Sequence, residues 1–520
     1  MTPRQTTNLH SAHLLQPLAL QLPLPDYFDL FRQEDYAFFL DSALPSDQLG
    51  RYCFVGGRPF LVFRAKRQPE RGPCTARCEV LQLAETVPPQ HTGSAAQQAA
   101  PRYVSQRVET TDDPFNALQQ LLDRYAVQRA DYAATPVPLL AGAIGYLGYE
   151  AGHYLERLPD TAEDDLQLPD MYFMFCDEIL AHCHQTGESF LSVSARAADP
   201  QAAKRQAEKK LDELRRRIDQ LERHPPVWSG PDQAALAGGG DMEIRTHFDE
   251  ASYAAQVNQI KEHIHAGDVY QACMTHRLQS PLYGGDAWNL YRELRRINPA
   301  PFASFLQFPE AAVASASPER FLKLDADRVA ESRPIKGTRP RSTMPEADLA
   351  LRDELSSSIK DQAENIMIVD LVRNDFGRVC RFNSVQVPEL MAIEPYATVF
   401  QMVSTVRGTL RDDVTPLDLV RACFPGGSMT GAPKIEAMKI IDSLEPVCRG
   451  IYSGAIGYLD FSGVLDLSIV IRSFVIKDNT CYYHVGGAIV ADSDPRAEYV
   501  ETMTKARALK QALANLRARL

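Results

Sequence analysis

A stretch rich in proline and glycine divides this 520-residue sequence into two long parts. It runs from His224-Pro225-Pro226 to Gly238-Gly239-Gly240, a composition typical of linkers. A chain of this length exceeds what one hydrophobic core usually serves, so two large lobes are expected. We therefore predict an amino-terminal domain over residues 1–235 and a second domain over residues 242–516.

The charge and the apolar pattern exclude several classes of protein. The formal net charge is −12 at pH 7, which argues against a nucleic-acid-binding protein because such proteins present a basic face. No apolar run is long enough to span a bilayer, and the amino terminus lacks the regions of a signal peptide. We expect no membrane association and a cytoplasmic location. The ten cysteines show no zinc-site spacing and are expected to be reduced.

Periodicity predicts helices on both sides of the linker. Over residues 201–223, Leu211, Leu214, Ile218 and Leu221 lie along one helical face. A second helix is expected over residues 248–266, ending at a glycine. Several other segments alternate apolar and polar residues, which favours antiparallel sheets with one covered face.

Several short segments of the second part are rich in charged residues and glycine, which makes them candidates for a functional site. Lys336, between an apolar residue and Gly337, is a candidate nucleophile, although a basic surface turn gives the same pattern. Helical spacing puts Asp361 beside Glu364, and Glu498 beside Glu501. Paired carboxylates on two helices can hold Mg²⁺, but surface glutamate pairs are common. A glycine-rich turn over residues 426–431 leads into a helix at Pro433, an arrangement that favours anions and also occurs in ordinary turns.

Seven strings of the second part resemble the chorismate-binding family that includes the anthranilate, aminodeoxychorismate, isochorismate and salicylate synthases. They are SASPERFL (315–322), SRPIKGTRPR (332–341), DQAENIMIVDLVRNDFGRV (361–379), PGGSMTGAPKIEAMKIID (425–442), YSGAIGY (452–458), IRS (471–473) and GGAIVADSDPRAEYVET (486–502). The resemblance implies an α+β, anthranilate-synthase-like fold. Two intertwined lobes would contain large packed antiparallel sheets with outer helices, and the active site would lie in the second lobe.

The resemblance also assigns roles to individual residues. It implies Mg²⁺ held by Glu364 and Glu501, with Glu498 and Asp361 beside them. The ion would clamp the ring carboxylate of chorismate. The remaining site residues implied by the resemblance are Glu319 as the general acid for the C4 hydroxyl, Arg472 and Tyr452 on the pyruvyl carboxylate, and Ser428, Gly486 and Lys505 close by. Gln271 and Gly337 complete the predicted substrate-binding residues.

Two positions distinguish the branches of the family. Members that add water have a lysine base where this sequence has Gln271, and glutamine cannot deprotonate water. Anthranilate synthases usually have alanine at the position of Lys336, whereas aminodeoxychorismate synthases have the lysine. The resemblance therefore implies amination of chorismate to 4-amino-4-deoxychorismate, for 4-aminobenzoate and folate. The alternative is an anthranilate synthase component, which releases anthranilate and pyruvate; a non-catalytic docking subunit is a third possibility.

The resemblance carries expectations about partners and two departures. No glutaminase nucleophile motif is found, so a separate glutamine amidotransferase subunit is expected to supply ammonia. A separate lyase would convert the product. Gln401 stands where many members have histidine. The string FFLDS (38–42) differs from the LLES string that serves tryptophan feedback in anthranilate synthases, so feedback is not expected, while a bound structural tryptophan stays open.

Overall fold

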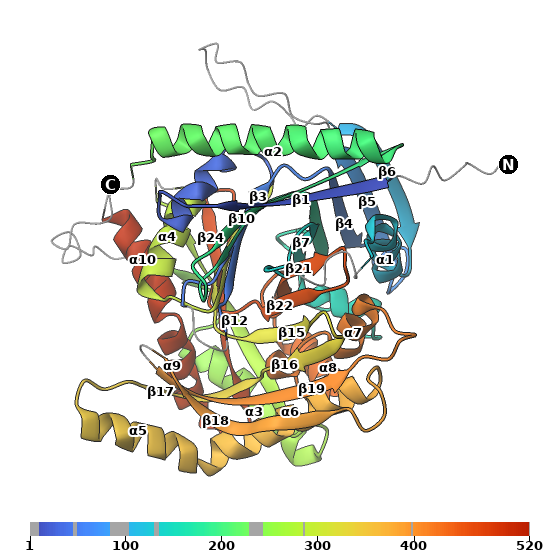
Figure 1. Ribbon diagram of the computed structural model, residues 1–520. Coiled ribbons are helices and arrows are strands. Elements are labelled where there is room, and N and C mark those ends of the chain that lie inside the picture. Colours follow the sequence, from blue (N-terminus) through green and yellow to red (C-terminus); the bar gives the residue numbers. More distant parts are fainter. Residues whose placement is uncertain are drawn as a thin grey trace.

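Two large β-sheets, each of twelve strands, form the centre of the protein (Figure 1). The computed structural model describes residues 10–44, 49–83, 103–128, 135–227, 243–283, 286–396 and 399–518. Within those residues, neighbouring strands of both sheets pair in the antiparallel sense. This agrees with the antiparallel sheets that the alternation of residues predicts.

The first sheet joins strands from both parts of the sequence. In spatial order its strands are β1 (His10–Leu18), β10 (Ser189–Ala197), β9 (Glu178–Cys183), β3 (Tyr52–Gly57), β2 (Ala37–Asp41), β13 (Phe302–Gln307), β14 (Ala312–Ser317), β23 (Ser473–Lys477), β24 (Thr480–Ile489), β12 (Gln271–Pro281) and β11 (Arg245–Thr246), with β20 (Gly431–Ala432) paired to β12. The early and late parts of the chain meet where Leu40 of β2 pairs with Ser304 of β13.

The second sheet also crosses between the two parts. Its strands are β17 (Ile335–Pro340), β19 (Val399–Thr409), β16 (Val329–Ser332), β15 (Arg320–Leu324), β22 (Leu465–Ile469), β21 (Ala455–Asp460), β7 (Gly142–Leu147), β8 (Met171–Cys176), β4 (Leu61–Arg67), β5 (Ala76–Leu83) and β6 (Tyr103–Thr111), with β18 (Gln386–Pro395) paired to β19. Gly457 of β21 pairs with Gly145 of β7. A side chain at Gly145 would meet the Tyr172 carbonyl oxygen at 1.8 Å, so only glycine allows this close approach.

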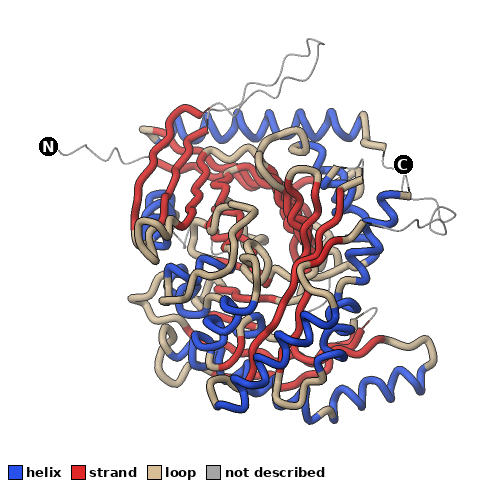
Figure 2. Tube along the Cα trace, turned by 180° about the vertical axis from the view of Figure 1, so that it is seen from behind, coloured by secondary structure: helices blue, strands red, loops and turns tan. Residues whose placement is uncertain are grey.

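Helices lie on the outside of the sheets, as Figure 1 and the reverse view in Figure 2 show. They are α1 (Pro114–Tyr125), α2 (Pro200–Arg223), α3 (Glu250–Ala266), α4 (Ala287–Ile297), α5 (Pro345–Ser357), α6 (Ile359–Gly377), α7 (Pro416–Cys423), α8 (Lys434–Leu444), α9 (Pro495–Lys505) and α10 (Arg507–Arg517), with short 3-10 turns η1 (Leu24–Leu30), η3 (Tyr149–Tyr154) and η5 (Gly427–Met429). Helix α2 runs along the top of Figure 1, and α5 and α6 lie at the bottom.

The apolar core has three main layers. Between the sheets, Phe38 and Phe54 of the first sheet pack in one cluster with Tyr146 and Tyr172 of the second. A second cluster lies under η1, α2, α4 and α10 on the outer face of the first sheet. A third lies under α1, α6 and α7 on the outer face of the second. The two lobes are therefore intertwined, because both sheets and their shared core draw on both parts of the chain.

The helices expected around the linker are confirmed with small shifts. Helix α2 buries Leu214 and Ile218, and Leu211 and Leu221 pack partly buried against the core. Helix α3 begins at Glu250, because Asp249 forms a capping box, and it ends at a left-handed glycine. The predicted boundary between residues 235 and 242 lies outside the described residues.

Two further expectations can be compared with the structure. The ten cysteines are all free. Most of them are buried within the apolar layers, as expected for small apolar side chains. In the described part of the chain, no helix has both the length and the apolar character needed to cross a bilayer.

Candidate active site

Lys336 is placed by an irregularity in strand β17. The register of β17 against β19 shifts between Lys336 and Thr338. Gly337, between them, has φ of +77°, and a side chain there would lie 2.7 Å from the Leu355 side chain and 2.8 Å from that of Asp361. The bulge redirects the strand and leaves Lys336 only 8% exposed. A nearly buried lysine therefore faces the interior from a tightly fixed backbone.

Glu319 lies between β14 and β15 and is 5% exposed. Burial raises the pKa of its carboxyl from 4.5 to about 7. Hydrogen bonds from the Ser428 hydroxyl and the Ile335 backbone, together with the charge of Lys336, oppose that rise. A carboxyl with a pKa near neutrality can hold a proton and donate it, which is what a general acid requires.

Two helices bring the predicted metal ligands toward one lysine. Glu364 of α6 lies 4.0 Å from the Lys360 ammonium, and Glu498 of α9 lies 3.7 Å from the same nitrogen. Glu498 also accepts a hydrogen bond of 2.7 Å from Ser493. Both carboxylates thus already share one cationic partner. The described residues contain no group of three acidic, histidine or cysteine side chains arranged to ligate a metal.

Glu501 and Asp361 have their own cationic partners. Glu501 lies 2.8 Å from Lys505, one helical turn along α9. Asp361 forms an ion pair of 3.1 Å with Arg339. Although desolvation opposes the shift, the charges of Lys505 and Lys360 lower the pKa of Glu501, so Lys360 interacts with three of the four predicted metal ligands.

Lys505 connects helix α9 with the first sheet. Its ammonium donates a hydrogen bond of 2.8 Å to the Gly486 carbonyl of β24, and its own carbonyl accepts one of 2.9 Å from Arg472. Gly486 leaves no room for a side chain, because a Cβ there would lie 2.4 Å from the Met274 carbonyl oxygen. Burial lowers the pKa of Arg472, while Tyr452 and Glu501 oppose that shift.

Several buried polar atoms around this region have no hydrogen-bond partner within the described chain. Gln271, at the start of β12, is fully buried, yet both its amide oxygen and its amide nitrogen lack partners. Gln401 Oε1 and His484 Nε2 are also unpartnered. The His484 ring stacks on that of Tyr452 at 5.0 Å between centroids. Buried polar groups are normally hydrogen-bonded, so each of these side chains is a candidate contact for a polar ligand.

The predicted site residues lie within a segment of the chain that matches a known protein family. A family model described as chorismate binding enzyme matches residues 80–511. The chain belongs to this family of chorismate binding enzymes. The match begins inside the predicted first domain and includes every predicted site residue.

Curated relatives of this chorismate-binding family lie at about 40% identity. A protein named aminodeoxychorismate synthase from Streptomyces pristinaespiralis is 43% identical over 416 residues, which cover 78% of this chain and 56% of that protein. The chain thus spans little more than half of that relative. Aminodeoxychorismate synthase component 1 of Escherichia coli K12 is 40% identical over 78% of this chain and 84% of its own length.

The solved structures support the fold expected from the chorismate-binding family. Anthranilate synthase component I from Streptococcus pneumoniae TIGR4 superposes with a TM-score of 0.69 and 26% identity, covering 89% of this chain and 92% of that one. The α+β fold with large antiparallel sheets and outer helices is therefore confirmed.

Two side chains at the candidate site were not identified from the sequence. Lys360 precedes Glu364 by one helical turn, a spacing that predicts contact within α6. Its second contact, with Glu498, joins segments far apart in the sequence, so no local pattern shows it. His484 lies on β24 without any motif around it, and its stacking on Tyr452 emerges only from the fold.

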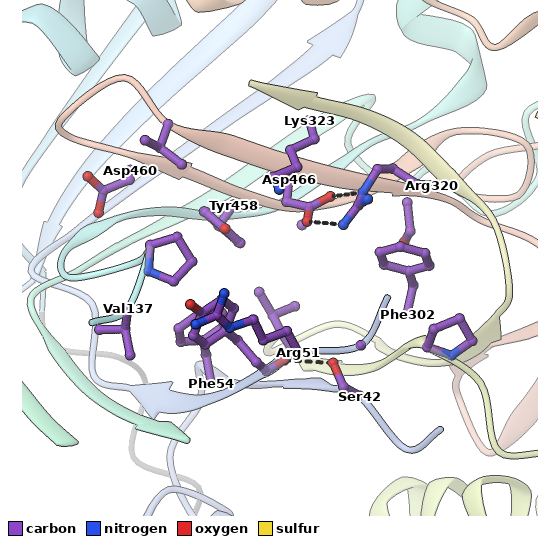
Figure 3. A pocket seen from close by; sticks show the side chains of 18 of the residues that line it. Ser42, Arg51, Phe54, Val137, Phe302, Arg320, Lys323, Tyr458, Asp460 and Asp466 are labelled. Atoms are coloured by element: carbon purple, nitrogen blue, oxygen red, sulfur yellow. Dashed lines mark hydrogen bonds and ion pairs between the residues drawn. The ribbon is translucent and has the colours of Figure 1, made fainter. Parts of the chain in front are cut away.

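A large cavity lies away from the predicted site residues (Figure 3). It has a volume of about 430 Å³ and opens between the sheets, with Phe54 from β3 and Tyr458 from β21 in its wall. Asp41 and Ser42 of the FFLDS string line it, and Arg320 is held there by Asp466 at 3.0 Å. None of the predicted site residues lines this cavity. A smaller one of about 20 Å³ adjoins Glu319 and Ser428, so cavity size alone would point away from the candidate chemistry.

Proposed function

We propose that the chain aminates chorismate with ammonia to give 4-amino-4-deoxychorismate and water. The observation that carries the proposal is the nearly buried Lys336 beside Glu319, in a site where Gln271 replaces a water-activating base. The names of the S. pristinaespiralis and E. coli relatives support the same reaction. Lys336 matters most because an amine can form the covalent intermediate that avoids one difficult displacement.

The first half-reaction uses Lys336 and Glu319. The Lys336 amine attacks ring C2, both ring double bonds shift by one position, and the bond from C4 to its hydroxyl breaks. Glu319 gives its proton to the departing hydroxyl, which leaves as water. The attacking amine loses one proton to the Glu319 carboxylate as the new carbon–nitrogen bond forms. Burial supports the role of Glu319, because it favours the protonated carboxyl needed for this transfer.

The second half-reaction releases the lysine. Ammonia attacks C4, both ring double bonds shift back, and the bond between C2 and Lys336 breaks. One proton lost by the attacking ammonia is gained by the departing lysine nitrogen, so the free amine is regenerated. The enolpyruvyl group is retained throughout. Arg472 is the proposed contact for the pyruvyl carboxylate, because a guanidinium can bind a carboxylate in two places. Tyr452 interacts electrostatically with Arg472.

We propose Mg²⁺ as the metal, held by Glu364 and Glu501, with Glu498 and Asp361 beside them. The surroundings of Lys360 support this proposal, because its ammonium lies 4.0 Å from Glu364 and 3.7 Å from Glu498, and its charge also acts on Glu501, so these carboxylates surround one cation. Mg²⁺ is commonly bound by one or two carboxylates together with waters and substrate oxygens, so a closed cage of protein ligands is not needed. When bound, it supplies charge neutralisation for the ring carboxylate of the substrate.

The proposal also covers the partner proteins and the cellular compartment. Ammonia would come from a separate glutamine amidotransferase subunit, as the designation component 1 of the E. coli relative suggests. A separate lyase would convert the product to 4-aminobenzoate for folate synthesis. The free cysteines support a reducing compartment such as the cytoplasm.

Product analysis tests the proposal. Purified protein is given chorismate, Mg²⁺ and ammonium at mildly alkaline pH, and the products are followed by mass and fluorescence. We expect a product that retains the pyruvyl group and yields 4-aminobenzoate only after a lyase is added. Fluorescent anthranilate with an equal amount of pyruvate would overturn the proposal in favour of an anthranilate synthase.

A further inference from the structure

We infer that Arg449 is a positioning residue that holds three substrate-binding segments in register. The inference rests on the proposed function, because it concerns the same site. Arg449 follows helix α8 and is only 2% exposed, and it does not belong to the set of residues expected to touch chorismate. Its side chain instead donates hydrogen bonds to groups that are close in the sequence to those residues.

All five N–H groups of the guanidinium have acceptors. Nε and Nη2 donate to the two carboxylate oxygens of Glu445 at 2.8 and 2.7 Å. Nη1 donates to the Met429 carbonyl at 2.7 Å and to the Ser453 hydroxyl at 3.3 Å. The remaining Nη2 hydrogen is donated to the Cys273 carbonyl at 2.7 Å. An arginine side chain has five such donors, so none is left unused.

Each of the three acceptors other than Glu445 is a near neighbour in the chain of a predicted substrate contact. The pairs are Met429 beside Ser428, Ser453 beside Tyr452, and Cys273 two residues after Gln271. These segments come from η5, from the turn before β21 and from β12, which are far apart in the sequence. One planar group therefore fixes the relative positions of three parts of the site.

Glu445 forms a second attachment of the same network to strand β12, two residues beyond Cys273. Its Oε1 atom accepts hydrogen bonds from the Thr275 backbone at 2.8 Å and from the Thr275 hydroxyl at 2.9 Å. Thr275 pairs across the sheet with Gly486, whose carbonyl binds Lys505. Through Thr275, the buried ion pair between Arg449 and Glu445 is therefore also connected to strand β24. Gly486 of this strand binds Lys505 of α9, the helix that contains two of the predicted metal ligands.

Stability alone does not account for this pair. Burying two charges carries a large desolvation penalty, and apolar side chains of similar volume often stabilise a core as well or better. Apolar side chains could not hold the Met429 and Cys273 carbonyls, however, because they have no donors. The geometry therefore points to a role in placing the substrate contacts.

The test compares two arginine-to-lysine variants in the full-length chain. Lysine has three donors and no planar fork, so Arg449→Lys cannot reach every acceptor. Arg277→Lys is the matched control, because Arg277 is also 2% exposed, pairs with Asp165 at 2.9 Å and lies over the Tyr482 ring. Although Arg277 lies on β12, neither of these side-chain contacts within the described residues is with a predicted site residue. We measure Tm, and kcat and KM for chorismate, for both.

Arg449→Lys is expected to lower kcat by on the order of 100-fold, because displacements near 1 Å in an active site have effects of that size. Arg277→Lys is expected to lower Tm similarly while kcat stays near the wild-type value. Equal losses of kcat at matched losses of Tm would overturn the inference. If Arg449→Lys does not fold, Glu445→Gln replaces it, because glutamine keeps the shape and loses the charge; a wild-type kcat in that variant would also overturn the inference.

The product assay separates this inference from the proposed function. If wild-type protein forms anthranilate, the proposed reaction fails, and the comparison of the two arginine variants can still be made on that product. If wild-type protein forms aminodeoxychorismate while Arg449→Lys behaves like Arg277→Lys, only the positioning role fails.

Discussion

Lys336 Nζ lies 3.9 Å from Glu364 Oε2, so the proposed nucleophile is held beside a proposed metal ligand. One residue comes from strand β17 and the other from helix α6. The contact allows two roles for the lysine, as a nucleophile or as a charge partner that merely balances the carboxylate. Substitutions that keep the charge and remove the nucleophile distinguish them.

Lys336→Arg is expected to abolish amination as fully as Lys336→Ala. Arginine keeps the positive charge beside Glu364, but its guanidinium is not deprotonated in proteins and cannot attack C2. We expect chorismate consumption to fall by on the order of 100-fold or more in both variants, as when other catalytic groups are removed. The measurement is kcat with ammonium as the nitrogen source. Near wild-type activity in Lys336→Arg alone would show that only the charge matters.

The raised pKa of Glu319 predicts opposite effects on activity and stability. Because burial raises the pKa from 4.5 to about 7, the folded protein favours the neutral carboxyl. Stability from this group is fully present below pH 4.5 and is lost as the pH rises through about 7, where the loss reaches about 3 kcal/mol. Glu319→Gln should therefore match the wild type in Tm near pH 4.5 and exceed it at pH 8.

The same substitution should lower kcat by roughly 100-fold, because an amide donates no proton. At a fixed concentration of free ammonia, wild-type kcat/KM for chorismate should decline as the pH rises through about 7. Thermal melts and initial rates across this range check both parts. A Tm that falls equally with pH in the two proteins would contradict the assigned environment of Glu319.

The helices and the chemistry-bearing strings were predictable because they depend on neighbours in the sequence. Helix α2 follows from the spacing of Leu214 and Ile218, and the end of α3 follows from Gly267. Strand pairing was not predictable, since Leu40 and Ser304 lie far apart in the sequence and no local pattern shows that they pair. The hydrogen bonds of Arg449 were not predictable for the same reason, because their acceptors lie in separate segments that share no sequence motif.

Gln271→Met is expected to separate substrate binding from stability. The amide of Gln271 is buried and has no hydrogen-bond partner among the described residues, and a buried unpaired polar group costs about 1–3 kcal/mol. Methionine has a similar volume and no amide, so Tm should rise or stay unchanged. KM for chorismate should rise, because chorismate can no longer form a hydrogen bond with the Gln271 amide. A fall in Tm of the size seen for a hydrogen-bonded core amide would show that Gln271 supports the fold instead.

Removal of magnesium is expected to stop turnover reversibly. Glu364→Gln should raise the Mg²⁺ concentration for half-maximal activity by roughly tenfold or more. A second measurement does not depend on activity: in the presence of chorismate, Mg²⁺ should raise the wild-type Tm by mass action, and less so in the variant. Glu331→Gln is the control, since Glu331 is similarly buried but pairs with Arg320 at 2.8 Å. Equal responses in the two variants would contradict the assignment of Glu364.

Gly337→Ala is expected to damage the site more than the backbone strain alone explains. Both Gly337 and Gly267 have positive φ, at +77° and +86°, where alanine costs about 1–2 kcal/mol. Nothing lies within 4 Å of a side chain at Gly267, whereas one at Gly337 would press on Leu355 and Asp361. Gly267→Ala should therefore lose stability and keep its kcat. Gly337→Ala should lose more stability and, because the strand shifts beside Lys336, most of its activity. Equal activity in the two variants at matched stability would show that the bulge does not position the lysine.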